Sequence, residues 1–259
     1  MNRLFFVVAL AVSTTQTALG ADIQNGLSPR RRPIRPPQPS GGLVVAEPTG
    51  KSIFLLNTSK HIGLSELRKA YVPILMDTRC PFEVVEDKGD KTLAEKVARV
   101  RLNPKAAFVV PFVDEGTQDM ISYFPERDLC IINVNALTAD SADRARVQVR
   151  LGKQLWRAVG MMLGAGDAVT GHTVLRRATT LAQLDANQVI TPAPEQHNQM
   201  VDGLKHFGID MVRLGSYRQA CQEGWAPAPT NDVQKAIWDK VHAIPQNPMK
   251  IEFDPKKGR

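Results

Sequence analysis

A row of basic side chains runs along one predicted helix between residues 140 and 164. At about 100° per residue, Arg146, Arg150, Lys153 and Arg157 project within roughly 60° of one another. No Asp or Glu lies between residues 144 and 166 to neutralise them along the helix. Because guanidinium and ammonium groups bind carboxylates through charge-assisted hydrogen bonds, the row predicts a cleft for an anionic ligand. Candidate ligands are an acidic peptide, an acidic protein or an anionic glycan.

The same basic row has two structural interpretations that the residues leave open. It can be a solvated face of the helix. Alternatively, its cations can pair with carboxylates on neighbouring strands, such as Asp114, Glu115 or Asp119. If the row binds a ligand, substituting Lys153 and Arg157 with Gln should weaken that binding and leave the stability nearly unchanged. Internal ion pairs predict a large loss of stability instead.

Local signals define the helix that carries the row. Asp143 is a suitable residue for its start, because a carboxylate is favoured where the first backbone N–H groups lack partners. The glycines at 164 and 166 supply its stop. Leu151, Leu155, Val159 and Met162 fall on one face and predict a core stripe.

The run from Lys153 to Leu163 resembles the zinc helix of the metzincin metalloproteases, which has the form H-E-x-x-H-x-x-G-x-x-H. Lys153 and Arg157 stand at the first two His positions, Leu163 stands at the third, and Gln154 replaces the Glu. Gly160 is retained. The resemblance implies a metzincin-type helix that has lost its zinc ligands and its general base.

A second stretch, from Thr173 to Arg176, resembles the Met-turn of the archaemetzincin branch, which has the form C-V-M-R. Leu175 would take the place of the Met. The resemblance spans roughly residues 50 to 185 and implies a zincin-like α+β fold, with a mixed sheet around the core helix. It also implies a pseudo-metalloprotease that holds no metal or other cofactor and works by binding.

Other catalytic patterns are absent from the sequence. None of the five histidines forms a ligand pair four residues apart on a helix, and no G-x-S-x-G or phosphate-binding glycine loop occurs. A nucleophilic triad whose members are distant in sequence stays open, so an active hydrolase or peptidase is the alternative function. Another is a structural cell-envelope component, which should expose an apolar patch around Trp225 or Trp238.

The N-terminal region predicts an exported protein. Residues 1–20 have the positive start, short apolar run and small-residue end of a signal peptide, with cleavage expected between Gly20 and Ala21. Residues 21–48 are rich in Pro and Arg and predict a disordered linker. We therefore expect a secreted or periplasmic protein without stable membrane insertion after cleavage. Residues 42–259 carry 28 basic and 25 acidic side chains, which gives no reason to expect nucleic-acid binding.

Hydrophobic patterns predict one globular domain over residues 49–259. Its first part, residues 49–166, contains the sheet and the central helix, and residues 167–259 form a helical C-terminal part. The order of predicted elements is β-α-β-α-β-β-β-α, with strands at 52–56, 82–85, 106–113, 120–124 and 129–134 and helices at 64–76, 90–101 and 140–164. Helical pieces follow at 195–207, 210–223 and 231–241. Cys130 is expected to be a buried thiol, and Cys80 and Cys221 are the one pair considered for a disulfide.

Overall fold

The computed structural model describes residues 41–115, 119–140, 143–169 and 171–243 of the 259-residue chain. They form two compact units, one of residues 47–213 and one that joins residues 41–46 to residues 214–243. The predicted signal peptide and most of the predicted linker lie outside the described residues. Within the described part of the chain, no helix combines the length and apolar character needed to cross a membrane.

Strands and helices alternate along the chain. The strands are β1 (Leu43–Val45), β2 (Ser52–Asn57), β3 (Phe82–Glu86), β4 (Ala106–Val113), β5 (Ile121–Phe124), β6 (Leu129–Asn133) and β7 (Leu214–Ser216). The helices are α1 (Leu64–Thr78), α2 (Leu93–Arg101), α3 (Val134–Thr138), α4 (Arg144–Met162), α5 (Leu181–Ala186), α6 (Pro194–Phe207), α7 (Tyr217–Gln222) and α8 (Asp232–His242), with one 3-10 turn at Pro125–Arg127.

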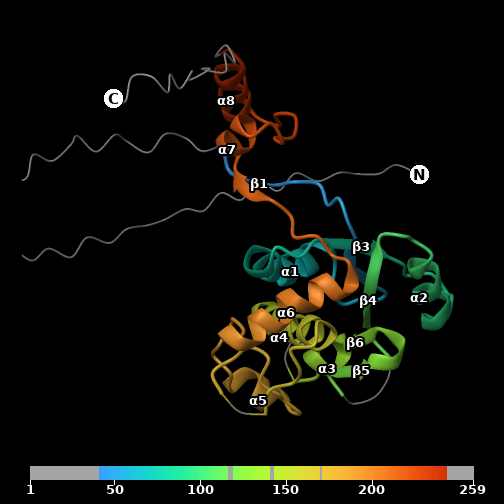
Figure 1. Cartoon of the computed structure of the whole chain (residues 1–259). Helices are drawn as coiled ribbons and strands as arrows, with labels where there is room; N and C mark the ends of the chain where they lie inside the picture. Colours follow the sequence, from blue (N-terminus) through green and yellow to red (C-terminus); the bar gives the residue numbers. More distant parts are fainter. Residues whose placement is uncertain (1–40, 116–118, 141–142, 170, 244–259) are drawn as a thin grey trace, which may run out of the picture. The chain divides into compact units, whose positions relative to one another are not determined.

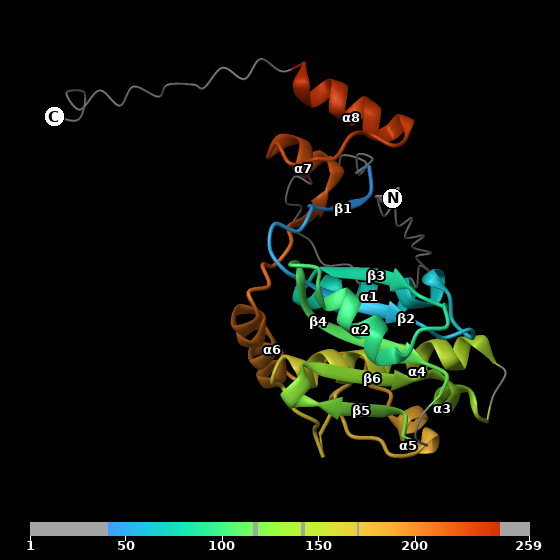
Figure 2. The ribbon, with the colours of Figure 1, turned by 90° about the vertical axis from the view of Figure 1, so that its right-hand side faces the viewer.

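The larger unit is built on a mixed sheet of five strands in the order β3-β2-β4-β6-β5 (Figure 2). The first four are parallel to one another. β5 leads through the 3-10 turn into β6 and lies antiparallel to it. This arrangement confirms the predicted α+β class, and the strands predicted at residues 120–124 and 129–134 form a hairpin. Parallel strands need long crossovers, which α1 and α2 supply.

Both faces of the central strands are buried. Ile53 and Leu55 of β2 belong to the main core with α1 and α4, whereas Phe54 and Leu56 belong to a second cluster with Val97 and Val100 of α2. Side chains alternate between the two faces of a strand, so a strand covered on both sides needs a continuous apolar run. The sequence of β2 has that run, as does the sequence of β4.

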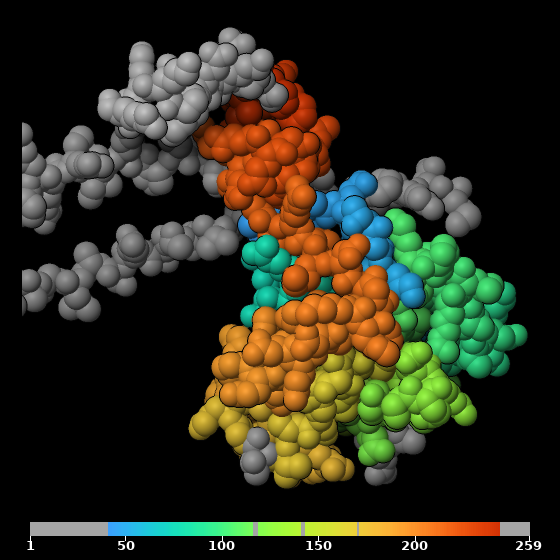
Figure 3. Space-filling model, viewed as in Figure 1, coloured from blue at the N-terminus to red at the C-terminus, as the bar shows by residue number. Residues whose placement is uncertain are grey.

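Helix α4 lies across the main core, and α6 packs on it from the outside (Figures 1 and 3). Asp143 caps α4 by accepting a hydrogen bond from the backbone N–H of Ala145 at 3.0 Å, as expected from the sequence. The helix ends at Met162, and Gly164 takes the positive φ of 82° that favours glycine.

The smaller unit corrects the predicted domain boundaries. β1 pairs antiparallel with β7, so residues 43–45 form a strand although the sequence placed them in a disordered linker. Residues 214–216, predicted to be helical, are the partner strand. Strand pairing between segments so distant in the chain has no local sequence signal, which explains both errors.

The tryptophans of the smaller unit are partly buried. Trp225 and Trp238 pack against a cluster centred on Val44, Tyr217 and Ile237, and Nε1 of Trp225 donates to Glu223 at 2.7 Å. Neither tryptophan is among the exposed large hydrophobic residues of the described chain. The apolar patch expected for a structural envelope component is therefore not formed by these residues.

The three cysteines are free, buried thiols. Burial raises the pKa of Cys130 to about 12 and also raises the pKa values of Cys80 and Cys221.

Because the thiolate is the reactive form, we expect slow reaction of these buried cysteines with Ellman's reagent in the native protein at pH 8. Denaturation without a reductant should expose all three thiols. A single thiol under those conditions would instead show that two of the cysteines form a disulfide, for which Cys80 and Cys221 are the pair considered from the sequence.

Candidate functional site

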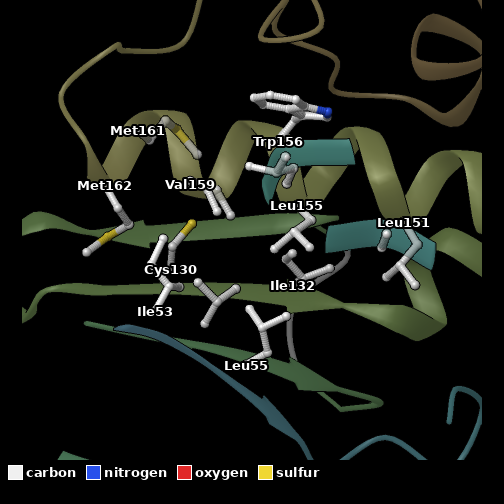
Figure 4. Close-up of a cluster of buried hydrophobic side chains, with 14 of the residues drawn as sticks. Ile53, Leu55, Cys130, Ile132, Leu151, Leu155, Trp156, Val159, Met161 and Met162 are labelled. Atoms are coloured by element: carbon white, nitrogen blue, oxygen red, sulfur yellow. The ribbon is translucent and has the colours of Figure 1, made fainter. Parts of the chain in front are cut away.

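The apolar face of α4 rests on the sheet as its sequence predicts. Leu151, Leu155, Val159 and Met162 are buried and face Ile132 and the other core side chains of the strands (Figure 4). Trp156 and Met161, which lie away from this stripe on the helix, are also buried. The helix is therefore enclosed on more than one side from Arg150 onward, and its basic residues must be accommodated inside the protein.

Arg150 is completely buried and holds two carboxylates. Its Nε and Nη2 donate to Asp185 at 2.8 and 2.5 Å, and its Nη1 and Nη2 donate to Asp140 at 2.6 and 3.1 Å. Nη1 also reaches the carbonyl oxygen of Leu137 at 2.9 Å. The hydrogen bonds that Arg150 donates lower the pKa values of both carboxyl groups, and the same bonds raise the pKa of Arg150.

Lys153 lies one turn further along the helix and is also buried. Its Nζ donates to the carbonyl oxygen of Leu184 at 2.8 Å. Desolvation lowers the pKa of Lys153, and the nearby charge of Asp185 opposes that shift. A buried ammonium group is tolerated only with such partners. The contact ties α4 to the end of α5.

Arg157 is the third buried cation. It donates three hydrogen bonds to the carboxylate of Asp167, one from Nε at 3.0 Å and two from Nη2 at 2.9 and 2.8 Å. Its Nη1 donates to Oε1 of Gln154 at 2.9 Å and to the carbonyl oxygen of Ala178 at 3.3 Å. The side-chain Nε2 of Gln154 donates in turn to the sulfur of Met120 at 3.7 Å.

The predicted open cleft under the basic row is therefore not found at Arg150, Lys153, Gln154 or Arg157. All four side chains are buried, and the charged ones are bonded to groups of the same chain. Arg146 is the exception, because it lies in the exposed first part of α4. Of the two structural interpretations, internal pairing applies to Arg150 and Arg157. Its acceptors, however, are Asp140, Asp167 and Asp185 and not the acids predicted on neighbouring strands.

Leu175, at the predicted Met-turn position, is fully buried directly beside Gly160 of α4. A Cβ built on Gly160 would lie 2.8 Å from both terminal methyl carbons of Leu175. The small residue therefore allows the segment around Leu175 to approach the helix closely. The resemblance places Gly160 in the zinc helix and Leu175 in the Met-turn, and these two residues thus lie close together.

The residues that the metzincin resemblance places at ligand positions do not suit a zinc ion. Zinc sites use imidazole nitrogens, thiolates or carboxylates, whereas Lys153 and Arg157 present cations and Leu163 has no donor atom. Gln154 has no carboxylate to accept a proton from water. Elsewhere in the described ranges, no group of three or more His, Cys, Asp or Glu side chains is placed to hold a metal.

One exposed basic group at the site was missed by reasoning from the sequence. Arg177 lies with its Nε 3.9 Å from Asp167, and its side chain is 64% exposed. Asp167 already neutralises Arg157, so the two guanidinium groups share a single carboxylate and positive charge remains at the surface. Arg176 is exposed next to it. The adjacent pair Arg176 and Arg177 in the sequence could have indicated this exposed basic group.

No protein-family model matches the sequence, and no curated protein matches it. Two solved structures are similar in fold. The archaemetzincin of Methanopyrus kandleri is 14% identical, with a TM-score of 0.43 over 60% of this chain and 96% of that one. A zinc-dependent peptidase of Methanocorpusculum labreanum is 13% identical, with a TM-score of 0.48 over 57% of this chain and 100% of that one.

Proposed function

We propose that this chain is a secreted or periplasmic pseudo-metalloprotease: a zincin-like protein without zinc chemistry that works by binding an acidic peptide or another anionic ligand. The observation that supports the loss of catalysis is the bonding of Lys153 and Arg157. Each stands at a former His position, and each is buried against an oxygen atom of the same chain. No step through a metal is available to this arrangement.

The binding part of the proposal rests on the cations that the protein leaves at its surface. Arg177 has only a long contact with Asp167, a carboxylate that is already engaged by Arg157. Arg146 projects from the exposed start of α4. A ligand carboxylate can form charge-assisted hydrogen bonds with such groups without breaking the buried pairs. The proposed contacts are therefore Arg177 and Arg146 and not the buried residues of the row.

A peptide is favoured as the ligand by the position of β5. This strand ends the sheet order, so its outer edge has no described strand paired with it. Tyr123, on this strand, is exposed, and its hydroxyl donates to the carbonyl oxygen of Met161 at 3.2 Å. An extended peptide can add to such an edge through main-chain hydrogen bonds.

The loss of zinc chemistry is tested on the protein purified without chelators. We expect mass spectrometry to find substoichiometric zinc, and added zinc to leave hydrolysis of a casein substrate at background. Stoichiometric zinc with peptide hydrolysis that a chelator abolishes would overturn the proposal. A matched variant with Lys153→His, Gln154→Glu, Arg157→His and Leu163→His should gain weak zinc affinity if the ancestry is real.

Binding is tested with a labelled oligo-glutamate peptide in fluorescence anisotropy. We expect Arg177→Gln to weaken binding roughly tenfold, because it removes a charge-assisted contact. Arg146→Gln should also weaken binding. Lys205→Gln is the matched control, since this exposed lysine pairs with Asp202 at 2.8 Å. An equal loss in all three variants would show general attraction to positive charge, and no loss in the two arginine variants would refute the site.

A further inference from the structure

The segment that follows α4, residues 165–187 apart from residue 170, has little regular structure of its own. It contains the short helix α5 and one isolated bridge between Ala168 and Arg176. Apolar contacts hold part of it, since Val174, Leu175 and Leu184 belong to the main core. Its other attachments must come from side chains of neighbouring elements.

Each of the three buried cations of α4 is bonded to this segment. Arg150 reaches Asp185, Lys153 reaches the carbonyl oxygen of Leu184, and Arg157 reaches Asp167 and the carbonyl oxygen of Ala178. The contacts occur near the beginning, the middle and the end of the segment. Because the cations follow one another along one line of the helix, a single rigid element fixes the whole segment.

We propose that Arg150, Lys153 and Arg157 form a clasp that fastens segment 165–187 to α4 at neutral pH, and that its Arg150 contact releases the α5 end of the segment when Asp185 and Asp140 become protonated in acid. This clasp would be a conformational device of the fold. It does not depend on the proposed binding function, because its three cations are buried and are not the proposed ligand contacts, Arg177 and Arg146.

The charged groups around the two carboxylates make acid the releasing condition. Asp185 faces Arg150, Arg146 and Lys153 from α4, and Asp140 faces Arg150 and Asp185. Apart from the other carboxylate, their neighbours are cations, so each is bound in its charged form. Protonation would leave the buried Arg150 with a weaker acceptor, and a buried charge without a partner is costly.

The direction of the pH effect follows from the lowered pKa values of Asp185 and Asp140. A carboxyl group whose pKa is lower in the folded protein stabilises it fully above the unfolded-state value, which is about 3.9 for Asp. That contribution is lost as the pH falls through the folded-state value. The clasp should therefore be closed at neutral pH and should open below about pH 4.

The closing experiment compares Asp185→Asn with Asp202→Asn, whose carboxylate makes an exposed pair with Lys205. At pH 7 we expect Asp185→Asn to lower the Tm by roughly 10 °C, and we expect the control to change it by less than about 2 °C. The difference between Asp185→Asn and the wild type should shrink as the pH approaches 3. A difference that stays constant with pH would overturn the role of Asp185.

Hydrogen exchange of the wild type supplies a second measurement that needs no variant. After correction for the intrinsic exchange rate, amides of residues 181–187 should lose protection between pH 4 and pH 2, whereas amides of β2 and β4 keep theirs. This outcome would show release of the segment from an intact sheet. Simultaneous loss in both regions would mean global unfolding and would refute the clasp.

Discussion

Replacing Gly203 with alanine is expected to lower the free energy of unfolding by about 3 kcal/mol. Gly203 lies in α6, where the helix crosses the end of α4. A Cβ at this position would lie 2.1 Å from the carbonyl oxygen of Leu163 and 2.7 Å from its carbonyl carbon. These are backbone atoms, so the clash can be relieved only by moving one helix relative to the other. Urea unfolding would measure the loss.

Gly152→Ala is the matched control for this experiment. Gly152 lies in α4, and a Cβ built on it would have no neighbour within 4 Å. Alanine reduces the conformational freedom of the unfolded chain, so this variant should be more stable than the wild type by about 0.5–1 kcal/mol. The opposite signs of the two changes test the packing of α6 on α4. A Gly203→Ala protein as stable as the wild type would show that this packing is wrong.

Arg150→Met is expected to lower the free energy of unfolding by about 3 kcal/mol. The variant removes five hydrogen bonds and leaves Asp140 and Asp185 without their cation. Both carboxylates are partly exposed, so solvent limits the loss. Arg150→Lys should recover part of the stability, because it keeps the charge without the planar set of donors. Thermal and urea unfolding would measure these differences.

Arg99→Met provides the control for the loss of an ion pair. Arg99 of α2 pairs with Asp87, and its side chain is 51% exposed. Exposed pairs contribute little, so this variant should lose less than about 1 kcal/mol. If Arg150→Met were equally mild, Arg150 would not be a structural residue. The binding role expected from the sequence would then regain support, because a ligand-binding cation can be replaced without loss of stability.

The buried pairs change how the basic row of α4 should be understood. The cations of Arg150, Lys153 and Arg157 do not form an open anion-binding site. Carboxylates and carbonyl oxygens of the same chain already occupy the positions that a ligand would need. Any ligand must therefore meet the protein at residues outside this row, which is why Arg177 and Arg146 are the residues to test first.

Local sequence was sufficient for much of the fold. The apolar runs at residues 52–56 and 106–113 predicted two strands, and the apolar stripe of α4 predicted a core helix, at places close to those observed. The residues that begin and end a helix are also recognisable from the local sequence, so Asp143 and Gly164 marked the two ends of α4. Such signals need only neighbouring residues and the repeat of a helix or strand, and both can be read from one chain segment.

The tertiary structure alone decided which charges are free. The acceptors of Arg150 and Arg157 are Asp140 and Asp167, 10 residues away, and Asp185, 35 residues away, outside the turns of α4. The pairing of β1 with β7 likewise joins distant segments. A helical repeat shows that basic side chains share a face, but it cannot show what the rest of the chain places against that face. The sequence by itself therefore determined a helix with a basic row, and only folding determined that most of this row is buried and neutralised.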